Sequence, residues 1–230
     1  MIKKVEEIFK QFDVTMTEVC EILLRADCKD YVDDLFSVSS KTKTIVSNQL
    51  FFAMASILLE GNVKNVLEIG SGSGGGTNRL SRLFPKATVF TVDIPIEEAV
   101  KSDVSWRVRH PNRIREFRQN IARDNIVFID SNSFFLPMLD LPKQFDFIFV
   151  DGDHKDPPVG ADIMFAYHRV RPGGFLFMDN YDIKPDPELA VAHVIESIRG
   201  LVEEEILLLP MYLYPPAYVE MQRLAMLVKK

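Results

Sequence analysis

The glycine-rich segment Val66–Thr77, VLEIGSGSGGGT, constrains the fold of this chain more than any other feature. An apolar run that would otherwise continue as a buried strand is followed directly by five glycines within seven residues. A glycine-rich turn between a strand and a helix lets the backbone approach a ligand that any Cβ would block, and it aims unpaired amides at that ligand. The spacing of Gly70, Gly72 and Gly75 matches the G-x-G-x-x-G pattern, so the segment predicts a nucleotide-like cofactor.

Asp93 follows the first of these glycines after about 20 residues, at the end of the next apolar run. At this position a carboxylate can accept hydrogen bonds from the hydroxyls of a ribose. Two alternatives stay open. The glycines are also compatible with a tight corner that binds nothing, and Asp93 with a helix-capping acid.

The order of the remaining segments predicts a doubly wound α/β fold with a mostly parallel, seven-stranded sheet, an antiparallel last strand and N-terminal helices. Short apolar runs alternate with amphipathic stretches that are long enough for crossover helices. The segment Pro210–Ala217 is too short and proline-rich for such a helix, so the last two strands are expected to be antiparallel. One helix is predicted from the apolar stripe Val5–Leu23, one over Thr42–Leu59 and one around Pro187–Ile198. The predicted strands are Asn65–Ile69, Thr88–Asp93, Ile126–Asp130, Phe145–Asp151, Gly174–Asp179, Glu205–Leu209 and Leu224–Val228.

Length and charge exclude several classes of protein. A chain of 230 residues is expected to form one domain, and its net charge of −6 disfavours binding to nucleic acid. No apolar run reaches the roughly 18 to 20 residues of a membrane span, and the N-terminal sequence lacks the apolar core of a secretory signal. We therefore expect a cytoplasmic protein without membrane contact. Cys20 and Cys28 lack metal-ligand spacing and are expected to be buried free thiols.

The motif V-L-E-I-G-S-G-S-G resembles the first motif of the class I S-adenosylmethionine-dependent methyltransferases, in which an acid lies two residues before the first glycine, as Glu68 does here. The resemblance covers Ser39–Lys230 and implies a Rossmann-like methyltransferase sheet. Asp93 matches the ribose-binding acid of that family. The segment I-D-S-N-S-F matches the adenine-contacting segment, with Ser131 in place of a glycine and Asn132 in place of an aspartate. The residues to which the resemblance assigns cofactor binding are Glu68, Gly70, Ser71, Gly72, Gly74, Asp93, Ser131, Asn132, Ser133 and Asp151.

Two neighbouring apolar runs end in acids, in the sequences V-D-G-D-H-K-D and M-D-N. Parallel strands present ligands at their carboxyl ends, so Asp151, Asp179 and Asn180 are expected to converge beside the glycine turn. Such oxygen donors suit magnesium or another divalent cation. The pattern is similar to that of the catechol and caffeoyl-CoA O-methyltransferases, in which the matching residues hold the metal, and to that of the bacterial D-G-D-H small-molecule methyltransferases.

The resemblance implies methyl transfer from S-adenosylmethionine to a hydroxyl of a small molecule, assisted by the metal. The catechol-type enzymes have a lysine three residues after the first metal-binding aspartate, where this chain has His154, followed by Lys155. His154 is the preferred catalytic base because an ordinary histidine pKa of about 6.5 suits proton transfer near neutral pH. Lys155 remains an alternative base, and a purely hydrogen-bonding role of His154 also stays open.

Other interpretations of the chain remain. A metal-independent methyltransferase, an NAD(P)-dependent oxidoreductase and a non-catalytic cofactor-binding protein would each keep the glycine turn. The six arginines between Arg107 and Arg123 are expected to form a solvated helix face, with recognition of an anionic substrate group as the alternative. We expect one methyltransferase domain over residues 1–230, in which residues 1–60 form a helical lid or cap and residues 61–230 the catalytic core. A homodimer is an open expectation.

Overall fold

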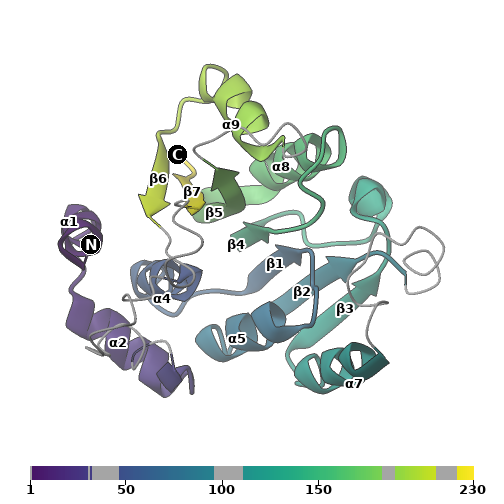
Figure 1. Cartoon of the computed structure of the whole chain (residues 1–230), viewed down its shortest axis with the longest axis horizontal. Helices are drawn as coiled ribbons and strands as arrows, with labels where there is room; N and C mark the ends of the chain where they lie inside the picture. The colour runs from purple at the N-terminus through teal and green to yellow at the C-terminus, as the bar shows by residue number, and fades with distance from the viewer. Residues whose placement is uncertain (1, 31, 33–46, 96–110, 183–189, 211–221) are drawn as a thin grey trace.

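The computed structural model of the chain describes residues 2–30, 32, 47–95, 111–182, 190–210 and 222–230. Its strands form one seven-stranded sheet in the order β3-β2-β1-β4-β5-β7-β6 (Figure 1). The strands β1 to β5 are parallel to one another, whereas β7 is antiparallel to both β5 and β6. The strand bounds are β1 Asn65–Ile69, β2 Thr88–Asp93, β3 Ile126–Asp130, β4 Phe145–Val150, β5 Val170–Asp182, β6 Ile206–Pro210 and β7 Gln222–Val228.

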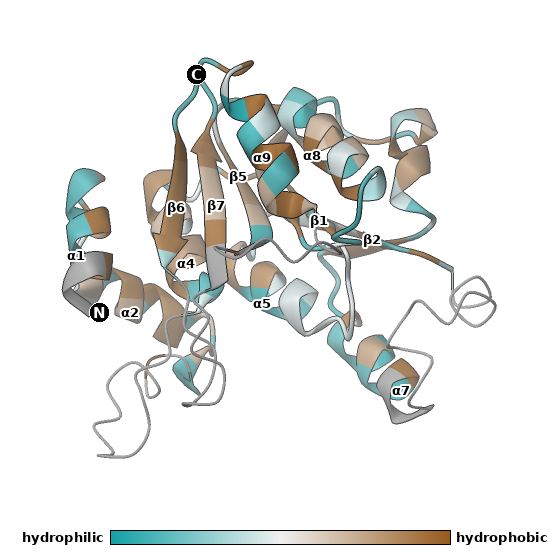
Figure 2. Ribbon diagram, turned by 45° about the horizontal axis from the view of Figure 1, so that its top comes forward, coloured by the Kyte–Doolittle hydropathy of each residue, from teal (hydrophilic) through white to brown (hydrophobic). Residues whose placement is uncertain are grey.

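Helices cover both faces of the sheet, and each face has its own apolar core (Figure 1). Side chains of α1, α2, α4 and α5 form one core with Val66 and Val89, whereas those of α8 and α9 form the other with Leu67 and Val92. Adjacent strand residues enter opposite cores because side chains alternate across a sheet. Strands β6 and β7 are accordingly mostly brown in Figure 2, while α9 is striped. The helix bounds are α1 Ile2–Gln11, α2 Met16–Arg25, α4 Asn48–Leu58, α5 Gly75–Leu83, α7 Pro111–Asn120, the short 3₁₀ helix η1 Ser133–Met138, α8 Pro158–Arg169 and α9 Val191–Arg199.

Helix α4 is anchored to the centre of the sheet by Phe52, which is only 1% exposed. Its ring makes edge contacts with three phenylalanine rings on two adjacent strands, and edge-to-face pairs of this kind add to the energy of apolar burial. The first turn of α4 is thereby held close to the carboxyl ends of the strands. The ring centroid of Phe52 lies 5.1, 4.9 and 5.0 Å from those of Phe147, Phe149 and Phe177.

The central strands β1 and β4 place the glycine turn, which follows β1, beside Asp151, which follows β4. The order of strands along the chain reverses between β1 and β4, and in open α/β sheets ligands bind in the crevice at this point. Two backbone hydrogen bonds extend the pairing beyond the strand ends, from the Gly70 amide to the Val92 carbonyl at 2.9 Å and from the Asp151 amide to the Ile69 carbonyl at 2.8 Å. Topology and backbone pairing therefore fix the position of any site built here.

The structure corrects the predicted N-terminal helix. The apolar stripe Val5–Leu23 is split between α1 and α2, because Asp13 adopts a positive φ of 55° and ends the first helix. Thr15 then starts α2 with a capping box, in which its side chain accepts a hydrogen bond from the Glu18 amide and the Glu18 carboxylate accepts one from the Thr15 amide. The apolar periodicity continues through both helices, so it does not show the break between them.

Several predicted boundaries also shift by a few residues. β4 ends at Val150 rather than Asp151, β5 extends from Val170 to Asp182, and the last two strands move by one or two residues. The predicted helix over Thr42–Leu59 appears as Asn48–Leu58, and its residues 42–46 lie outside the described part of the chain, as do residues 187–189 of the predicted later helix. The predicted sheet and its antiparallel last strand are confirmed. Among the described helices, none combines the length and the apolar character required to cross a membrane.

Candidate functional site

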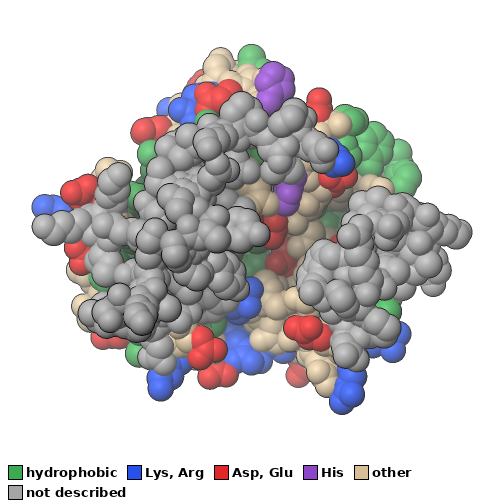
Figure 3. All heavy atoms as spheres, viewed as in Figure 1, with side chains coloured by type: hydrophobic (Ala, Val, Ile, Leu, Met, Phe, Trp, Pro, Cys, Tyr) green, Lys and Arg blue, Asp and Glu red, His purple; other side chains and the backbone are tan. Residues whose placement is uncertain are grey.

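A cleft of about 960 Å³ opens at the carboxyl ends of β1, β2 and β4. Figure 3 shows acidic side chains and a histidine in a hollow near the centre of this face. The glycine turn, the strand ends, the start of η1 and the first turn of α4 all contribute to its lining. Ten of the predicted site residues line this cleft, namely Glu68, Gly70, Ser71, Gly72, Asp93, Asn132, Ser133, Asp151, His154 and Lys155.

Two glycines of the turn are required by close contacts within the protein. Gly70 has a φ of +99°, and a Cβ at this position would lie 2.0 Å from the Asp151 carbonyl oxygen. A Cβ at Gly76 would lie 2.5 Å from Oε1 of Glu68. Gly70 thus allows the turn to pass the end of β4, and Gly76 leaves room for a buried carboxylate.

Three amides of the turn are used inside the protein, whereas the sequence predicts that amides of the turn point unpaired at a ligand. The Gly70 amide donates to Val92, the Gly72 amide to the Asp93 carboxylate at 2.9 Å, and the Gly74 amide to the Ser71 carbonyl at 2.7 Å. A pyrophosphate-binding turn needs free amides to hold its anion. The turn therefore has the shape of a nucleotide-binding loop without the donor set that a pyrophosphate requires at these three positions.

Glu68 is the buried acid at the centre of the turn, with 2% of its surface exposed. Its Oε2 accepts hydrogen bonds from the hydroxyls of Thr91, at 2.7 Å, and Thr77. Burial raises the pKa of Glu68 to about 7, because it outweighs the two threonine hydrogen bonds and is reinforced by the charge of Asp151. The hydroxyl of Ser71 lies 2.7 Å from that of Thr91, so a chain of buried hydroxyls connects the turn, β2 and Glu68.

Asp93 holds the turn from the end of β2. Its Oδ2 accepts the Gly72 amide and its Oδ1 accepts the Ile94 amide at 2.8 Å. These contacts show a structural role, and because each carboxylate oxygen has a second lone pair, the side chain can also accept a hydrogen bond from a ligand in the cleft. Both interpretations of Asp93 are thus compatible with its placement.

The segment after β3 forms the wall of the cleft next to Asp93. Asn132 caps η1 by accepting the Phe134 amide at 2.9 Å, and together with Ser133 it lines the cleft. Ser131 is tied to Asp93 by its amide, at 3.1 Å, and is not among the residues that line the cleft. The predicted assignment of Ser131 to cofactor binding thus has no direct contact with the cleft to support it.

Asp151, His154, Asp179 and Asn180 converge at the edge of the cleft. His154 Nε2 lies 3.3 Å from Asp151 Oδ1, and the Asn180 amide nitrogen lies 3.0 Å from both ring nitrogens of His154. The contacts are compatible with a proton on Nε2 directed at Asp151 and an Nδ1 that accepts from Asn180. Burial lowers the pKa of His154, but the hydrogen bond and charge of Asp151 outweigh burial, so the pKa lies above its ordinary value.

Asp179 is the acid most affected by this cluster. Burial, together with the charge of the nearby Asp151, raises its pKa to about 7. Its Oδ1 is buried and has no hydrogen-bond partner, which is a costly state for an ionised carboxylate. Within the described residues, however, no group of three histidine, cysteine or acidic side chains is arranged to hold a metal ion. The predicted metal residues thus meet, but the amide nitrogen of Asn180 is directed at His154.

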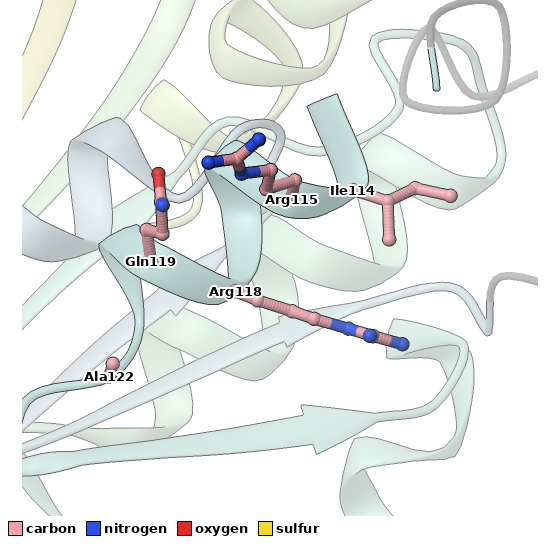
Figure 4. Close-up of a pocket in the computed structure, with 5 residues that line it drawn as sticks. All are labelled: Ile114, Arg115, Arg118, Gln119 and Ala122. Atoms are coloured by element: carbon pink, nitrogen blue, oxygen red, sulfur yellow. The ribbon is translucent and has the colours of Figure 1, made fainter. Parts of the chain in front are cut away.

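A second hollow, of about 480 Å³, lies along α7 and shares no residue with the cleft (Figure 4). It is lined by Ile114, Arg115, Arg118, Gln119 and Ala122. These residues belong to the arginine-rich segment, of which residues 107–110 lie outside the described part of the chain. The described residues that line this hollow include no acid or histidine, whereas those of the first cleft include both.

Comparison with known proteins identifies the family. Residues 67–181, which are half of the chain, match a family described as a methyltransferase domain. The chain belongs to this methyltransferase family. The matched residues include the glycine turn, Asp93 and the Asp151–Asn180 cluster, and the match confirms the recognition from sequence of a class I methyltransferase.

Relatives of the methyltransferase are distant. It is 34% identical over 144 residues to an uncharacterised protein of Acanthamoeba polyphaga mimivirus, which covers 58% of this chain and 60% of that protein. It is 35% identical over 136 residues to a fatty-acid O-methyltransferase of Mycolicibacterium smegmatis, and this match covers 56% of this chain and 42% of that protein. The chain thus spans less than two thirds of the length of either relative. The structure of an O-methyltransferase from Bacillus cereus in complex with SAH matches all of both chains with a TM-score of 0.56 at 20% identity, which shows the shared fold.

Thr77 and Thr91 of the methyltransferase were not predicted from sequence as site residues. Both are fully buried, and both hydroxyls donate to Glu68. Local sequence does not show that a threonine will bond to a buried acid, because threonine is common in strands. For Thr91, moreover, the partner Glu68 is 23 residues away in the sequence. A polar residue within an otherwise apolar buried strand was the one available indication.

Proposed function

We propose that the chain transfers a methyl group from S-adenosylmethionine to an oxygen of a small hydroxylated molecule. Family membership supports methyl transfer, and the Bacillus cereus protein of the same fold is described in complex with SAH. The observation that carries the proposal is the position of the Asp151–His154 pair at the edge of the cleft that the glycine turn lines. An acid-oriented histidine beside a nucleoside-sized cleft suits proton removal from an acceptor hydroxyl.

In this proposal the cofactor occupies the cleft between the glycine turn and η1. Asp93 accepts from the ribose hydroxyls, Asn132 and Ser133 border the adenine, and Glu68 and Ser71 lie at the turn. The fit rests on Gly70 and Gly76, whose missing Cβ atoms leave the space for the turn and for Glu68. When bound, S-adenosylmethionine supplies an electrophilic methyl group on a positively charged sulfur. The amides of Gly70, Gly72 and Gly74 are bonded within the protein, so these three give no donors to the pyrophosphate of a nicotinamide dinucleotide.

His154 is the proposed base, because it is held on both sides. Asp151 contacts Nε2, and the Asn180 amide nitrogen lies 3.0 Å from both ring nitrogens, so the ring is held by two side chains. For His154 to accept the acceptor proton, the ring nitrogen contacted by Asn180 exchanges that amide for the hydroxyl of the acceptor. Lys155 also lines the cleft, but its side chain is exposed, so it is the weaker candidate.

As a finer form of the proposal, Asp151 and Asp179 hold a divalent cation. The unpartnered Oδ1 of Asp179 and the adjacent carboxylate of Asp151 suit a hard cation, which would relieve their repulsion. Such a cation lowers the pKa of a bound acceptor hydroxyl. The side chains of Asp151 and Asp179 would then orient the acceptor, while His154 still removes its proton.

Calorimetry with S-adenosylhomocysteine and NADH tests the cofactor assignment. We expect the wild type to bind S-adenosylhomocysteine and to show no heat with NADH. The variant His154→Gln should bind with unchanged affinity but lose about 100-fold or more of its turnover with a catechol, whereas Lys155→Ala should retain most activity. Preferential binding of NADH, or full activity of His154→Gln with every hydroxyl acceptor, would overturn the proposal.

Chelation and substitution together test the cation. We expect excess EDTA to abolish turnover, added magnesium to restore it, and Asp151→Ala to lose activity while keeping most of its affinity for S-adenosylhomocysteine. If the protein remains fully active in EDTA, the metal-independent form of the methyltransferase is correct.

A carboxylate acceptor is a second candidate, because one relative is described as a fatty-acid O-methyltransferase. A fatty acid with a pKa of about 4 to 5 is already ionised at neutral pH, so its methylation needs no base. The variant His154→Gln separates the two candidates. Retained turnover with a fatty acid would support the carboxylate acceptor, and parallel loss with fatty acid and catechol would exclude it.

A further inference from the structure

Four side chains beneath the glycine turn share a buried network of hydroxyl groups and one carboxylate. Glu68, Ser71, Thr77 and Thr91 are at most 4% exposed, and Thr91 lies at the centre on β2. Its hydroxyl is 2.7 Å from Glu68 Oε2, 2.7 Å from the Ser71 hydroxyl and 3.3 Å from the Thr77 hydroxyl. Thr91 is not among the residues that line the cleft, so any effect on a ligand must pass through its partners.

The direction of each hydrogen bond in this network follows from the number of available protons. A hydroxyl has one proton to donate, and Thr91 donates its proton to the Glu68 carboxylate. Ser71 must therefore donate to Thr91 in the 2.7 Å contact between them. Once its proton is directed inward, the Ser71 hydroxyl has only lone pairs left for the cleft.

Other groups near Ser71 are also acceptors or are already bonded, whereas Arg79, which lines the same cleft, adds a positive charge that acts on Glu68. Oε2 of Glu68 is taken by two threonine hydroxyls, while Oε1 faces Gly76 in the lining of the cleft. The Gly72 amide, a donor that could have faced a ligand, is used by Asp93. Ser71 and Glu68 thus offer hydrogen-bond acceptors and a buried acid to the cleft, an arrangement that suits a positively charged donor.

We propose that Thr91 is a positioning residue that turns Ser71 and Glu68 into acceptors and thereby makes this end of the cleft selective for an ammonium group. The inference rests on the proposed function, in which the ammonium is that of the amino-acid end of the cofactor. Because Glu68 is buried, its carboxylate attracts a cation placed beside it more strongly than an exposed acid would. Without the Thr91 hydroxyl, Ser71 is free to donate toward the cleft and Glu68 loses one of its two donors.

The test compares two ligands that differ in one group, S-adenosylhomocysteine and its analogue without the α-amino group, with Kd values from calorimetry. Thr91→Val keeps the shape of the side chain and removes its hydroxyl. We expect Thr91→Val to weaken the binding of S-adenosylhomocysteine about tenfold, as for loss of a hydrogen bond to a charged group. The same substitution should weaken the binding of the deaminated analogue less than about twofold. Thr91→Ser should restore the difference. Thr88→Val is the matched control, since it makes the same substitution on the same strand, and it should match the wild type.

A double-mutant cycle identifies the route of the effect. If Thr91 acts through Ser71, the effects of Thr91→Val and Ser71→Ala on the affinity for S-adenosylhomocysteine should be markedly less than additive. Equal weakening of both ligands by Thr91→Val, or unchanged affinity for both, would overturn the inference. A wild type that binds neither ligand would overturn the proposed function and this inference with it, whereas a wild type that binds both while Thr91→Val has no selective effect overturns the inference alone.

Discussion

At the scale of single residues, the site is defined by Glu68 and the groups that leave it room. Its carboxylate is buried beside Gly76, and two threonine hydroxyls hold it in place. Because these hydroxyls restrict the carboxylate, it cannot easily move away from a new atom. The geometry of the turn is therefore sensitive to changes as small as one methyl group.

Gly75 and Gly76 provide a matched pair of substitutions. An alanine Cβ at residue 76 would lie 2.5 Å from Glu68 Oε1, whereas at residue 75 the nearest atom is 3.4 Å away. We expect Gly76→Ala to destabilise the protein by about 1 to 3 kcal/mol through overpacking and to weaken binding of S-adenosylhomocysteine. Gly75→Ala should be neutral or slightly stabilising in the first turn of α5. Urea unfolding and calorimetry measure both effects, and equal behaviour of the two variants would contradict the predicted role of Gly76.

The raised pKa of Glu68 predicts how stability depends on pH. The native state keeps a proton on Glu68 up to a pKa of about 7, whereas the unfolded chain releases it near 4.5. The stabilising contribution of the protonated acid is complete below pH 4.5 and is lost as the pH rises through 7. We expect Glu68→Gln to gain stability relative to the wild type by about 1.4 kcal/mol per pH unit across this range. Urea unfolding at pH 5 and pH 8 measures the change, exposed Glu116→Gln is the control, and parallel profiles of wild type and Glu68→Gln would refute it.

At the scale of elements, helix α4 joins the N-terminal region to the sheet and the cleft. Phe52 packs against β4 and β5, and Asn48 and Gln49 in the first turn of α4 line the cleft. The sequence predicted this helix, since its apolar residues are frequent enough to indicate burial. It did not predict which residues contact the sheet, because almost every side chain from Gln49 to Ala55 is apolar and the periodicity is weak.

Truncation of Phe52 should measure how strongly α4 is anchored. We expect Phe52→Ala to reduce the free energy of unfolding by about 3 to 5 kcal/mol, because it opens a cavity between three aromatic rings. Phe134→Ala removes the same atoms from a side chain that is 64% exposed and should change stability by less than about 0.5 kcal/mol. Chemical denaturation of both variants tests the difference, and a loss below about 1 kcal/mol for Phe52→Ala would show that the site repacks.

At the scale of the whole molecule, contacts between distant segments close the fold. Glu204, just before β6, accepts hydrogen bonds from Tyr167 of α8 at 2.9 Å and from the Lys230 amide at 3.2 Å, and it pairs with Lys229 at 3.1 Å. The N-terminal helices share a core with the sheet. These contacts support our proposal that residues 1–230 form one domain. Because α1, α2 and α4 all contribute to this core, the cap over residues 1–60 stays a proposal.

The Glu204 cluster predicts a defined loss of stability in acid. Burial raises the pKa of Glu204, but the hydrogen bonds from Tyr167 and Lys229 outweigh it and lower the pKa to about 2. The stabilising contribution is therefore present above the ordinary pKa of 4.5 and is lost as the pH falls toward 2. We expect the wild type to lose more stability between pH 5 and pH 3 than Glu204→Gln does. Denaturant unfolding at both pH values tests this, the exposed neighbour Glu205→Gln should follow the wild type, and an identical acid profile of Glu204→Gln would rule the cluster out.

The sequence by itself determined the strands, the glycine turn, the methyltransferase family and the meeting of Asp151, Asp179 and Asn180. Alternation, apolar runs and glycine spacing are local properties, and the carboxyl ends of parallel strands meet at one edge whatever their side chains. Only the tertiary structure decided which groups are left to bind a ligand. The Gly72 amide, the hydroxyl of Ser71 and the side-chain amide of Asn180 all have partners on other segments. Whether a donor is free depends on the segment packed against it, and residues far apart in sequence supply that segment.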